Sequence, residues 1–256
     1  MTPDILANVI RGNTVESVHR GHYLVIDGDG NTLGSGGDPS TVTYFRSSCK
    51  SIQAIPFIAS GAADRFGFTE DEIALAVASH SGERIHVEIA ASMLAKAGFG
   101  EHDLRCGAHL PFNEAESRRM IAAGEKPTQL HNNCSGKHAA MLALARHIGA
   151  DAAGYDLMSN PVQTAILERI AQFTESPVSD IAIGIDGCAA PNFAVPVAAM
   201  ARSFISLLNP PDSFDGATRA ACKRIVNAMI EHPDLVGGTG RLDTMIMEAA
   251  RGKLIC

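Results

Sequence analysis

The segment Tyr44-Phe45-Arg46-Ser47-Ser48-Cys49-Lys50-Ser51 lies between two different hydrophobic patterns. Before its end, residues 41–45 form an extended, β-prone run that stops at an arginine. After it, Ile52, Ile55 and Ile58 recur at the spacing of one helix face. The segment therefore predicts a strand that passes directly into a helix, with polar side chains at the junction.

Ser47 and Lys50 stand three residues apart at the start of this predicted helix, which places both on one face. Ser-x-x-Lys is the arrangement of acyl-transferring serine enzymes. A serine hydroxyl needs a neighbouring base, and a lysine serves when burial or a nearby positive charge such as Arg46 lowers its pKa. The same spacing also arises by chance in chains of this length, so the pair needs support from the rest of the sequence.

Composition limits the classes of protein that the chain can belong to. Its 256 residues, 46% of them hydrophobic, suffice for a sizeable core in one large or two small domains. The net charge is −7 and no basic cluster occurs, so we expect no nucleic-acid partner. No run approaches the roughly 18 apolar residues that span a bilayer, so we also expect no membrane association.

The N-terminus lacks the basic and apolar regions of a signal peptide, and we therefore expect a cytoplasmic protein with reduced thiols. The six cysteines show no Cys-x-x-Cys pairing and no compact disulfide framework. A cysteine with a role in this chain is thus expected to act as a ligand or nucleophile.

The pattern of elements predicts an α/β or α+β fold. Residues 5–37 read as β structure with tight turns, including a strong hairpin signal at 27–31. A short apolar run at 179–185 suits a buried strand, and 253–256 reads as the beginning of another. Helical patterns cover most of the remainder: 47–60, 70–79, 84–97, 114–123, 134–149, 160–174, 195–208, 216–231 and 240–251. Asn113 is expected to cap the fourth of these.

Three further polar segments carry candidate chemistry. Residues 78–83 contain Ser79 and could line a pocket, although they also suit a simple helix-ending turn. Asp186 and Cys188 follow the apolar run, where loops often hold functional groups, although Asp-Gly alone marks a turn. The third segment is His131-Asn-Asn-Cys134-Ser-Gly-Lys137-His138.

In that third segment, a helix beginning near Ser135 would present Cys134, Lys137 and His138 together at its N-terminus. The helix dipole and Lys137 both favour a thiolate at Cys134. Such a thiolate could attack a substrate or bind zinc, whereas a buried inert cysteine is the commoner case. Gly136-Lys137 lacks the upstream glycine of a phosphate-binding loop because His131 stands there, which excludes nucleotide binding of that kind.

Taken together, Phe-Arg-Ser-Ser-x-Lys, Ser-His-Ser-Gly-Glu, Asn-Cys-Ser-Gly-Lys-His and Asp-Gly-Cys resemble, in order and spacing, the Rhizobium etli-type L-asparaginases. These are the thermolabile, inducible asparaginase II group. The resemblance runs from about Leu6 to the last residue. It implies one catalytic domain over 1–256, a fold similar to glutaminases and serine β-lactamases with a mixed sheet and a large helical portion, and hydrolysis of L-asparagine to L-aspartate and ammonia by a homodimer.

The resemblance also implies roles for individual residues. Ser47 and Lys50 match a nucleophile–base pair, and Ser79 matches the serine of a second Ser–Lys tandem. A substrate-binding group is matched by Arg46, His138 and Asp186. An unusual zinc site that modulates substrate binding is matched by Cys134, Lys137 and Cys188, and its lysine must lose a proton to bind the metal.

One departure from the family pattern concerns the second tandem. Family members continue through a Lys-Gly-Gly-Ala-Glu-Gly-type segment that begins about where Cys256 stands, and the lysine partner of the second serine lies there. We therefore expect a C-terminally truncated chain, a sheet without its central strands, and no lysine partner for Ser79. Lys253 precedes the last apolar run and is not an evident substitute.

Three other functions are compatible with these segments. A glutaminase or a penicillin-recognising serine hydrolase would share the fold, although Gly238-Thr-Gly240 is the nearest approach to a Lys-Thr-Gly motif. A non-catalytic zinc-binding or amino-acid-sensing protein would keep the cysteines and Lys137 without needing Ser47 and Lys50. A cysteine hydrolase would use Cys134 with His131 or His138.

Overall fold

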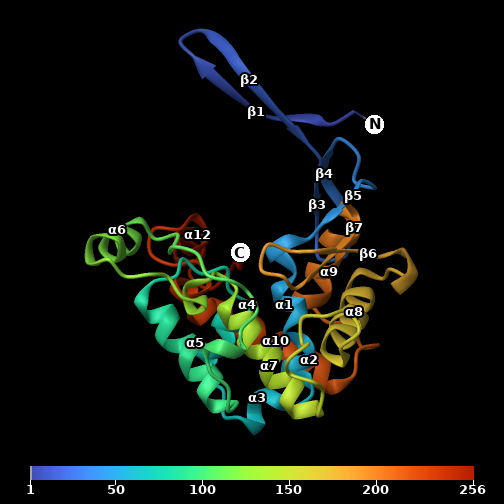
Figure 1. Cartoon of the computed structure of the whole chain (residues 1–256). Coiled ribbons are helices and arrows are strands. Elements are labelled where there is room, and N and C mark those ends of the chain that lie inside the picture. Colours follow the sequence, from blue (N-terminus) through green and yellow to red (C-terminus); the bar gives the residue numbers. More distant parts are fainter. Residues whose placement is uncertain (1) are drawn as a thin grey trace.

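The computed structural model describes residues 2–256 and has an α+β architecture, which confirms the predicted fold class. Helices form the body, and strands gather at one end of it (Figure 1). All strand pairs among the described residues are antiparallel: β1 (Asp4–Arg11) with β2 (Thr14–Gly21), β3 (Tyr23–Ile26) with β4 (Thr32–Gly36), and β7 (Pro191–Pro196) with both β5 (Val42–Tyr44) and β6 (Ala182–Ile185). The strands thus form three small antiparallel sheets and not one mixed sheet, because hairpins or returning segments connect the paired strands.

Two consecutive hairpins occupy the N-terminal region, as the sequence predicts. The first pairs β1 (Asp4–Arg11) with β2 (Thr14–Gly21), and the second pairs β3 (Tyr23–Ile26) with β4 (Thr32–Gly36). The Asp27 carboxylate closes the second turn by accepting hydrogen bonds from backbone N–H groups at 3.0 and 2.8 Å. The expected hairpin signal at 27–31 is therefore confirmed.

The β1–β2 hairpin extends away from the helical body (Figure 1). Nearly all of its residues are exposed. Apolar side chains are among them: Ile5, Leu6, Val9, Ile10, Val15 and Val18. A two-stranded hairpin with so much exposed apolar surface is marginal in water without further packing.

The helical body contains short and long helices whose ends follow local signals. The Asn113 side chain accepts a hydrogen bond from the Glu116 N–H at 3.0 Å, which confirms the predicted cap. The described helices are α1 (Lys50–Gln53), α2 (Ile55–Ala59), α3 (Ala62–Arg65), α4 (Glu70–Val77), α5 (Arg84–Lys96), α6 (Glu114–Ala123), α7 (Ser135–Ile148), α8 (Pro161–Thr174), α9 (Val197–Leu208), α10 (Gly216–Glu231), α11 (Pro233–Val236) and α12 (Leu242–Ala250).

Helix α7 lies at the centre of the core, and its residues from Ser135 to Ala145 are all buried. It packs against α4 and α5. At Gly136 the backbone of α7 approaches α4 so closely that an added Cβ would collide with the Leu75 carbonyl. Glycine is therefore required here, because the N-terminus of α7 is pressed against the element that leads to Ser79.

The structure differs from the sequence in three predictions about strands. Strand β6 (Ala182–Ile185) begins later than expected and is mostly exposed, because it is an edge strand. The buried central strand is β7 (Pro191–Pro196), which the sequence pattern did not reveal because prolines stand at both ends. The segment 253–256 forms turn and irregular structure, so the strand predicted there is wrong.

Candidate active site

The strand-to-helix junction exists as the sequence predicts. Strand β5 (Val42–Tyr44) is followed by the 3₁₀-helix η1 (Arg46–Cys49), which runs directly into α1. Ser47 lies half-buried in η1, whereas Lys50 at the start of α1 is buried. Ser47 thus lines a cavity, whereas the longer Lys50 side chain extends into the protein interior.

The Lys50 ammonium has three acceptors inside the protein. Its Nζ lies 2.5 Å from the Ala78 carbonyl oxygen, 2.9 Å from Ser79 Oγ and 3.2 Å from the Asn133 carbonyl oxygen. These acceptors match the three hydrogens of an ammonium group. Burial lowers the pKa of Lys50.

This geometry places Lys50 next to a different serine from the one three residues before it in the sequence. Among the described residues Lys50 donates to Ser79, and no hydrogen bond joins it to Ser47. Ser79 therefore has Lys50 as a hydrogen-bond partner, which is not the further lysine that the family pattern implies. The reason is burial, because an interior ammonium must satisfy all its hydrogens, and the acceptors available lie on the loops that precede α5 and α7.

Ser47 and Ser79 open into one cavity of about 390 Å³, a volume within the usual range of small-molecule sites. Polar and apolar side chains share its wall. The lining residues are Ser47, Ser48, Ser51, Val77, Ser79, Phe112, Asn133, Phe204, Met229, Val236, Arg241, Asp243, Ile255 and Cys256. The sequence analysis missed the apolar part, since no local signal brings side chains of α9, α10 and α11 to Ser79.

The loop that contains Ser79 is held by hydrogen bonds to residues close to the C-terminus. The Ser79 N–H donates to the Val236 carbonyl at 3.1 Å. Glu83 accepts hydrogen bonds from Ser81 Oγ at 2.6 Å and from the Thr239 N–H at 2.7 Å. Although burial opposes it, these hydrogen bonds lower the pKa of Glu83. At Gly238, with φ of 116°, any Cβ would collide with the Ser81 side chain.

Two buried histidines continue this support. The rings of His80 and His86 stack with their centroids 4.8 Å apart. Each Nδ1 accepts a backbone N–H, from Gly82 and from Glu83 respectively, so each proton resides on Nε2. His80 Nε2 then donates to Ser135 Oγ at 2.9 Å, which joins the Ser79 loop to α7. Burial lowers the pKa of both rings.

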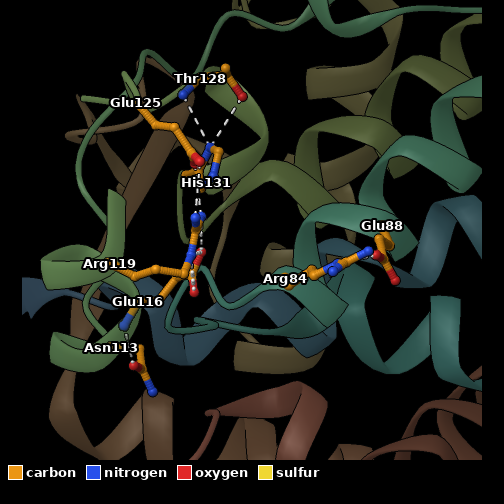
Figure 2. A network of polar contacts seen from close by, with 8 residues as sticks. All are labelled: Arg84, Glu88, Asn113, Glu116, Arg119, Glu125, Thr128 and His131. Atoms are coloured by element: carbon orange, nitrogen blue, oxygen red, sulfur yellow. Dashed lines mark hydrogen bonds and ion pairs between the residues drawn. The ribbon is translucent and has the colours of Figure 1, made fainter. Parts of the chain in front are cut away.

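Phe112 and Asn133 line the cavity, and polar contacts brace the segment between them. Arg119 lies between two carboxylates (Figure 2), and its Nη2 donates to Glu116 and to Glu125, each at 2.8 Å. His131 Nδ1 accepts the Thr128 N–H at 3.1 Å. These contacts connect α6 with the loop that follows it, between the two residues that line the cavity.

A second cluster lies behind Lys50 and contains Cys134, Lys137 and Cys188, as the sequence predicts. Lys137 Nζ lies 3.1 Å from Cys188 Sγ, and all three residues are buried. A hydrogen bond from Cys188 and the charges of Lys50 and Lys137 lower the pKa of Cys134 to about 4. The contact with Cys134 raises the pKa of Cys188. Burial opposes the charge of Lys137, but the two sulfurs raise its pKa.

The donor types of this cluster suit zinc, since two thiols and one amine are nitrogen and sulfur ligands. Zinc–ligand distances of about 2.3 Å to sulfur and 2.1 Å to nitrogen place neighbouring ligands of a tetrahedral ion roughly 3.5 Å apart. The observed 3.1 Å between Lys137 Nζ and Cys188 Sγ is close to that spacing. Among residues 2–256, no group of three or more His, Cys, Asp or Glu side chains offers a metal site, so a zinc site here depends on the lysine.

The expected substrate-binding residues lie in two places, and none lines the cavity. Arg46 and Asp186 approach each other, with Nε and Oδ1 3.5 Å apart. His138 is fully buried on α7, where its Nδ1 lies 2.6 Å from the Tyr155 hydroxyl oxygen. His138 therefore does not line this cavity, because its side chain is buried in the core.

The fold and the cavity define an α+β protein with a serine-lined pocket backed by a buried lysine. The family model of L-asparaginase II matches residues 7–256, and the chain belongs to that family. No curated protein matches the chain significantly. Family membership supports an amidohydrolase that acts on asparagine. No helix in the described part of the chain is long and apolar enough to cross a bilayer.

Proposed function

We propose that this protein is an L-asparaginase of the Rhizobium etli type, which converts L-asparagine to L-aspartate and ammonia. The observation that carries the proposal is the meeting of Ser47 and Ser79 at one cavity of about 390 Å³, with Lys50 Nζ 2.9 Å from Ser79 Oγ. Two hydroxyls and an amine at a small-molecule cavity supply a nucleophile and a proton acceptor.

In the proposed reaction Ser47 Oγ attacks the side-chain amide carbon of asparagine. In this step Lys50 is in the neutral amine form, which its burial favours, and it accepts the proton of the Ser47 hydroxyl through the Ser79 hydroxyl beside it. The carbon–nitrogen bond then breaks, ammonia leaves with that proton, and an aspartyl ester remains on Ser47. Water adds to the ester, and its cleavage returns a proton to Ser47 and releases aspartate.

We propose that Arg46 and Asp186 bind the charged groups of the amino acid. Their ion pair at 3.5 Å is long, and the Arg46 side chain is 71% exposed. Such a pair is weak in water and can exchange partners at little cost. Arg46 would then pair with the α-carboxylate and Asp186 with the α-ammonium. Because His138 is buried, we propose that it stabilises the site from behind and does not contact the substrate.

Zinc is proposed to bind Cys134, Lys137 and Cys188. When bound it would supply a fixed positive charge that favours the thiolates and organises the adjacent loop, modulating substrate binding. Asn133 connects this cluster with the catalytic groups, since its carbonyl accepts from Lys50 while its neighbour Cys134 is a proposed ligand.

The exposed apolar side chains of β1 and β2 support two further proposals. We propose that these strands pack against further strands, and that the enzyme forms a homodimer. Light scattering of the 256-residue chain tests the second point. The proposal also places the protein in the cytoplasm, where its six unpaired cysteines stay reduced.

The decisive experiment is rapid mixing with asparagine, with ammonia release followed over the first turnover. Ester formation on Ser47 predicts a burst of ammonia in the unchanged protein and none in Ser47→Ala. A burst that persists in Ser47→Ala but vanishes in Ser79→Ala would assign the nucleophile to Ser79. Zinc binding without any amide hydrolysis would instead support a non-catalytic zinc-binding or amino-acid-sensing protein. Faster ammonia release from glutamine than from asparagine would support a glutaminase.

A further inference from the structure

Just before Ser47 the chain leaves the third sheet, and the hydrogen-bond acceptor of its backbone changes from a carbonyl to a side chain. Tyr44 pairs with Ala194 of β7, and the Phe45 N–H donates to the Phe193 carbonyl at 3.0 Å. At the next residue the acceptor changes, because the Arg46 N–H donates to the Asn192 side-chain Oδ1 at 3.1 Å. A side-chain oxygen thus takes the place of a backbone acceptor where the chain separates from the sheet.

Arg46 also has a strained backbone. Its φ of 56° lies in the left-handed region, which a residue with a Cβ adopts reluctantly. Three other non-glycine residues have positive φ: Glu175 and Arg251 stand at helix C-termini, where this conformation is common, and Ala189 lies in the turn between β6 and β7. Arg46 instead precedes the proposed nucleophile directly, and strained residues of this kind persist only when neighbouring contacts hold them.

Asn192 is suited to hold this turn. It lies on the central strand β7 and is 5% exposed. Its Oδ1 accepts a second hydrogen bond, from the Phe193 N–H at 2.9 Å, so two backbone donors fix the position of one oxygen. The side chain is therefore a rigid acceptor built on the most strongly paired strand of the sheet.

Other contacts of the turn are weaker or begin after it. The Arg46–Asp186 ion pair is long and its arginine is exposed, so it does not restrain the backbone. Ser48 Oγ donates to the Phe45 carbonyl at 2.7 Å, and this hydrogen bond closes η1 around the turn. Only Asn192 binds the Arg46 backbone from another element among the described residues.

We propose that Asn192 is the positioning residue of Ser47: by accepting the Arg46 N–H it maintains the left-handed turn that directs the Ser47 hydroxyl into the cavity. The proposal rests on the proposed function, in which Ser47 is the nucleophile. Asn192 touches no substrate in this proposal, and its effect passes through the backbone of Arg46.

The first test compares Asn192→Ala, which removes the acceptor, with Asn192→Asp, which keeps an oxygen at the same position. For Asn192→Ala we expect kcat for asparagine to fall at least tenfold, with KM changed less than threefold. The rate at which a fluorophosphonate labels Ser47, followed by mass spectrometry, should fall by a similar factor. Asn192→Asp should recover most of both rates. Wild-type kcat and labelling in Asn192→Ala would overturn the proposal.

A double-mutant cycle with Arg46→Gly separates positioning from general stability. Glycine adopts a φ of 56° without strain, so the turn no longer needs the Asn192 acceptor. Adding Asn192→Ala to Arg46→Gly should therefore slow Ser47 labelling less than threefold. An equal factor in both backgrounds would mean that Asn192 acts elsewhere, and would overturn the proposal. If Asn192→Ala does not fold, Asn192→Ser takes its place, because its hydroxyl is too short to reach Arg46.

Ser47→Ala, measured in parallel, distinguishes failure of this proposal from failure of the proposed function. Retained asparagine hydrolysis in Ser47→Ala would remove the nucleophile assignment, whatever Asn192 does. Loss of hydrolysis in Ser47→Ala together with a normal Asn192→Ala would refute the positioning role alone.

Discussion

Lys50 Nζ lies 2.9 Å from Ser79 Oγ, although 29 residues separate the two in the chain. The same ammonium binds the carbonyl of Asn133, next to the Cys134–Lys137–Cys188 cluster. Lys50 therefore links the serine-lined cavity with the proposed zinc ligands, and its replacement should affect both.

Replacing Lys50 with methionine should lower kcat for asparagine by about 10²- to 10⁴-fold, the usual contribution of a general acid–base group. Arginine should not restore activity at this position, because a guanidinium does not lose its proton and is bulkier. Steady-state ammonia release measures both variants. Lys223→Met, which changes an exposed lysine of α10, serves as the control. A Lys50→Met protein with nearly full activity would exclude the lysine from proton transfer.

The free energy of unfolding should fall as the pH drops below about 6.5, the ordinary pKa of histidine. Burial holds the pKa of His80 and His86 below that value in the folded state. Below pH 6.5 the unfolded chain therefore binds protons that the folded protein does not, and stability decreases with acidification. Each histidine contributes a slope of at most about 1.4 kcal/mol per pH unit.

Urea unfolding between pH 5 and 8 measures that slope. His86→Gln should reduce it, whereas His102→Gln should not, because the His102 side chain is exposed. The explanation fails if the free energy of unfolding depends on pH in the same way in His86→Gln and in the unchanged protein.

Gly238→Ala should destabilise the protein by about 1–3 kcal/mol more than Gly240→Ala. Both glycines have positive φ, but an added Cβ meets the Ser81 and Glu83 side chains only at position 238. The difference thus isolates the collision from the backbone strain. Thermal unfolding measures stability, and asparagine hydrolysis reports on the Ser79 loop. Equal losses for the two variants would contradict the packing of this loop against Ser81.

Removal of one thiol should abolish most zinc affinity. Cys134→Ala and Cys188→Ala should each weaken zinc binding by about 100-fold or more, since even groups that only orient zinc ligands contribute 10- to 100-fold. Zinc titration with a competing chelator measures the affinity. Cys222→Ala is the matched control, because Cys222 is equally buried but lies on α10. Unchanged zinc affinity in Cys188→Ala would remove the proposed ligand set.

Local sequence signals determined the helices well. The bounds predicted for α6 and α10 agree with the structure, because Asn113 and Asp215 cap them with side-chain hydrogen bonds and the helical period is regular. The strand-to-helix junction at Ser47 and the clustering of Cys134 with Lys137 also follow from short-range spacing. Such features depend on neighbours in the chain and need no knowledge of the rest of the fold.

The tertiary structure alone decided which groups meet. Ser47 and Lys50 are neighbours in sequence, but burial directs the lysine to acceptors on distant loops, so its partner is Ser79. The helix period could not tell which side of α7 faces a cavity, and His138 faces the core. Strand β7 is identified only by its pairing with β5 and β6 in the folded protein. Asn192 lies on this strand and accepts the hydrogen bond of the turn before Ser47. The sequence by itself thus determined the chemical groups and their local elements, while long-range packing determined their partners, because buried polar atoms take whatever acceptors the fold brings within reach.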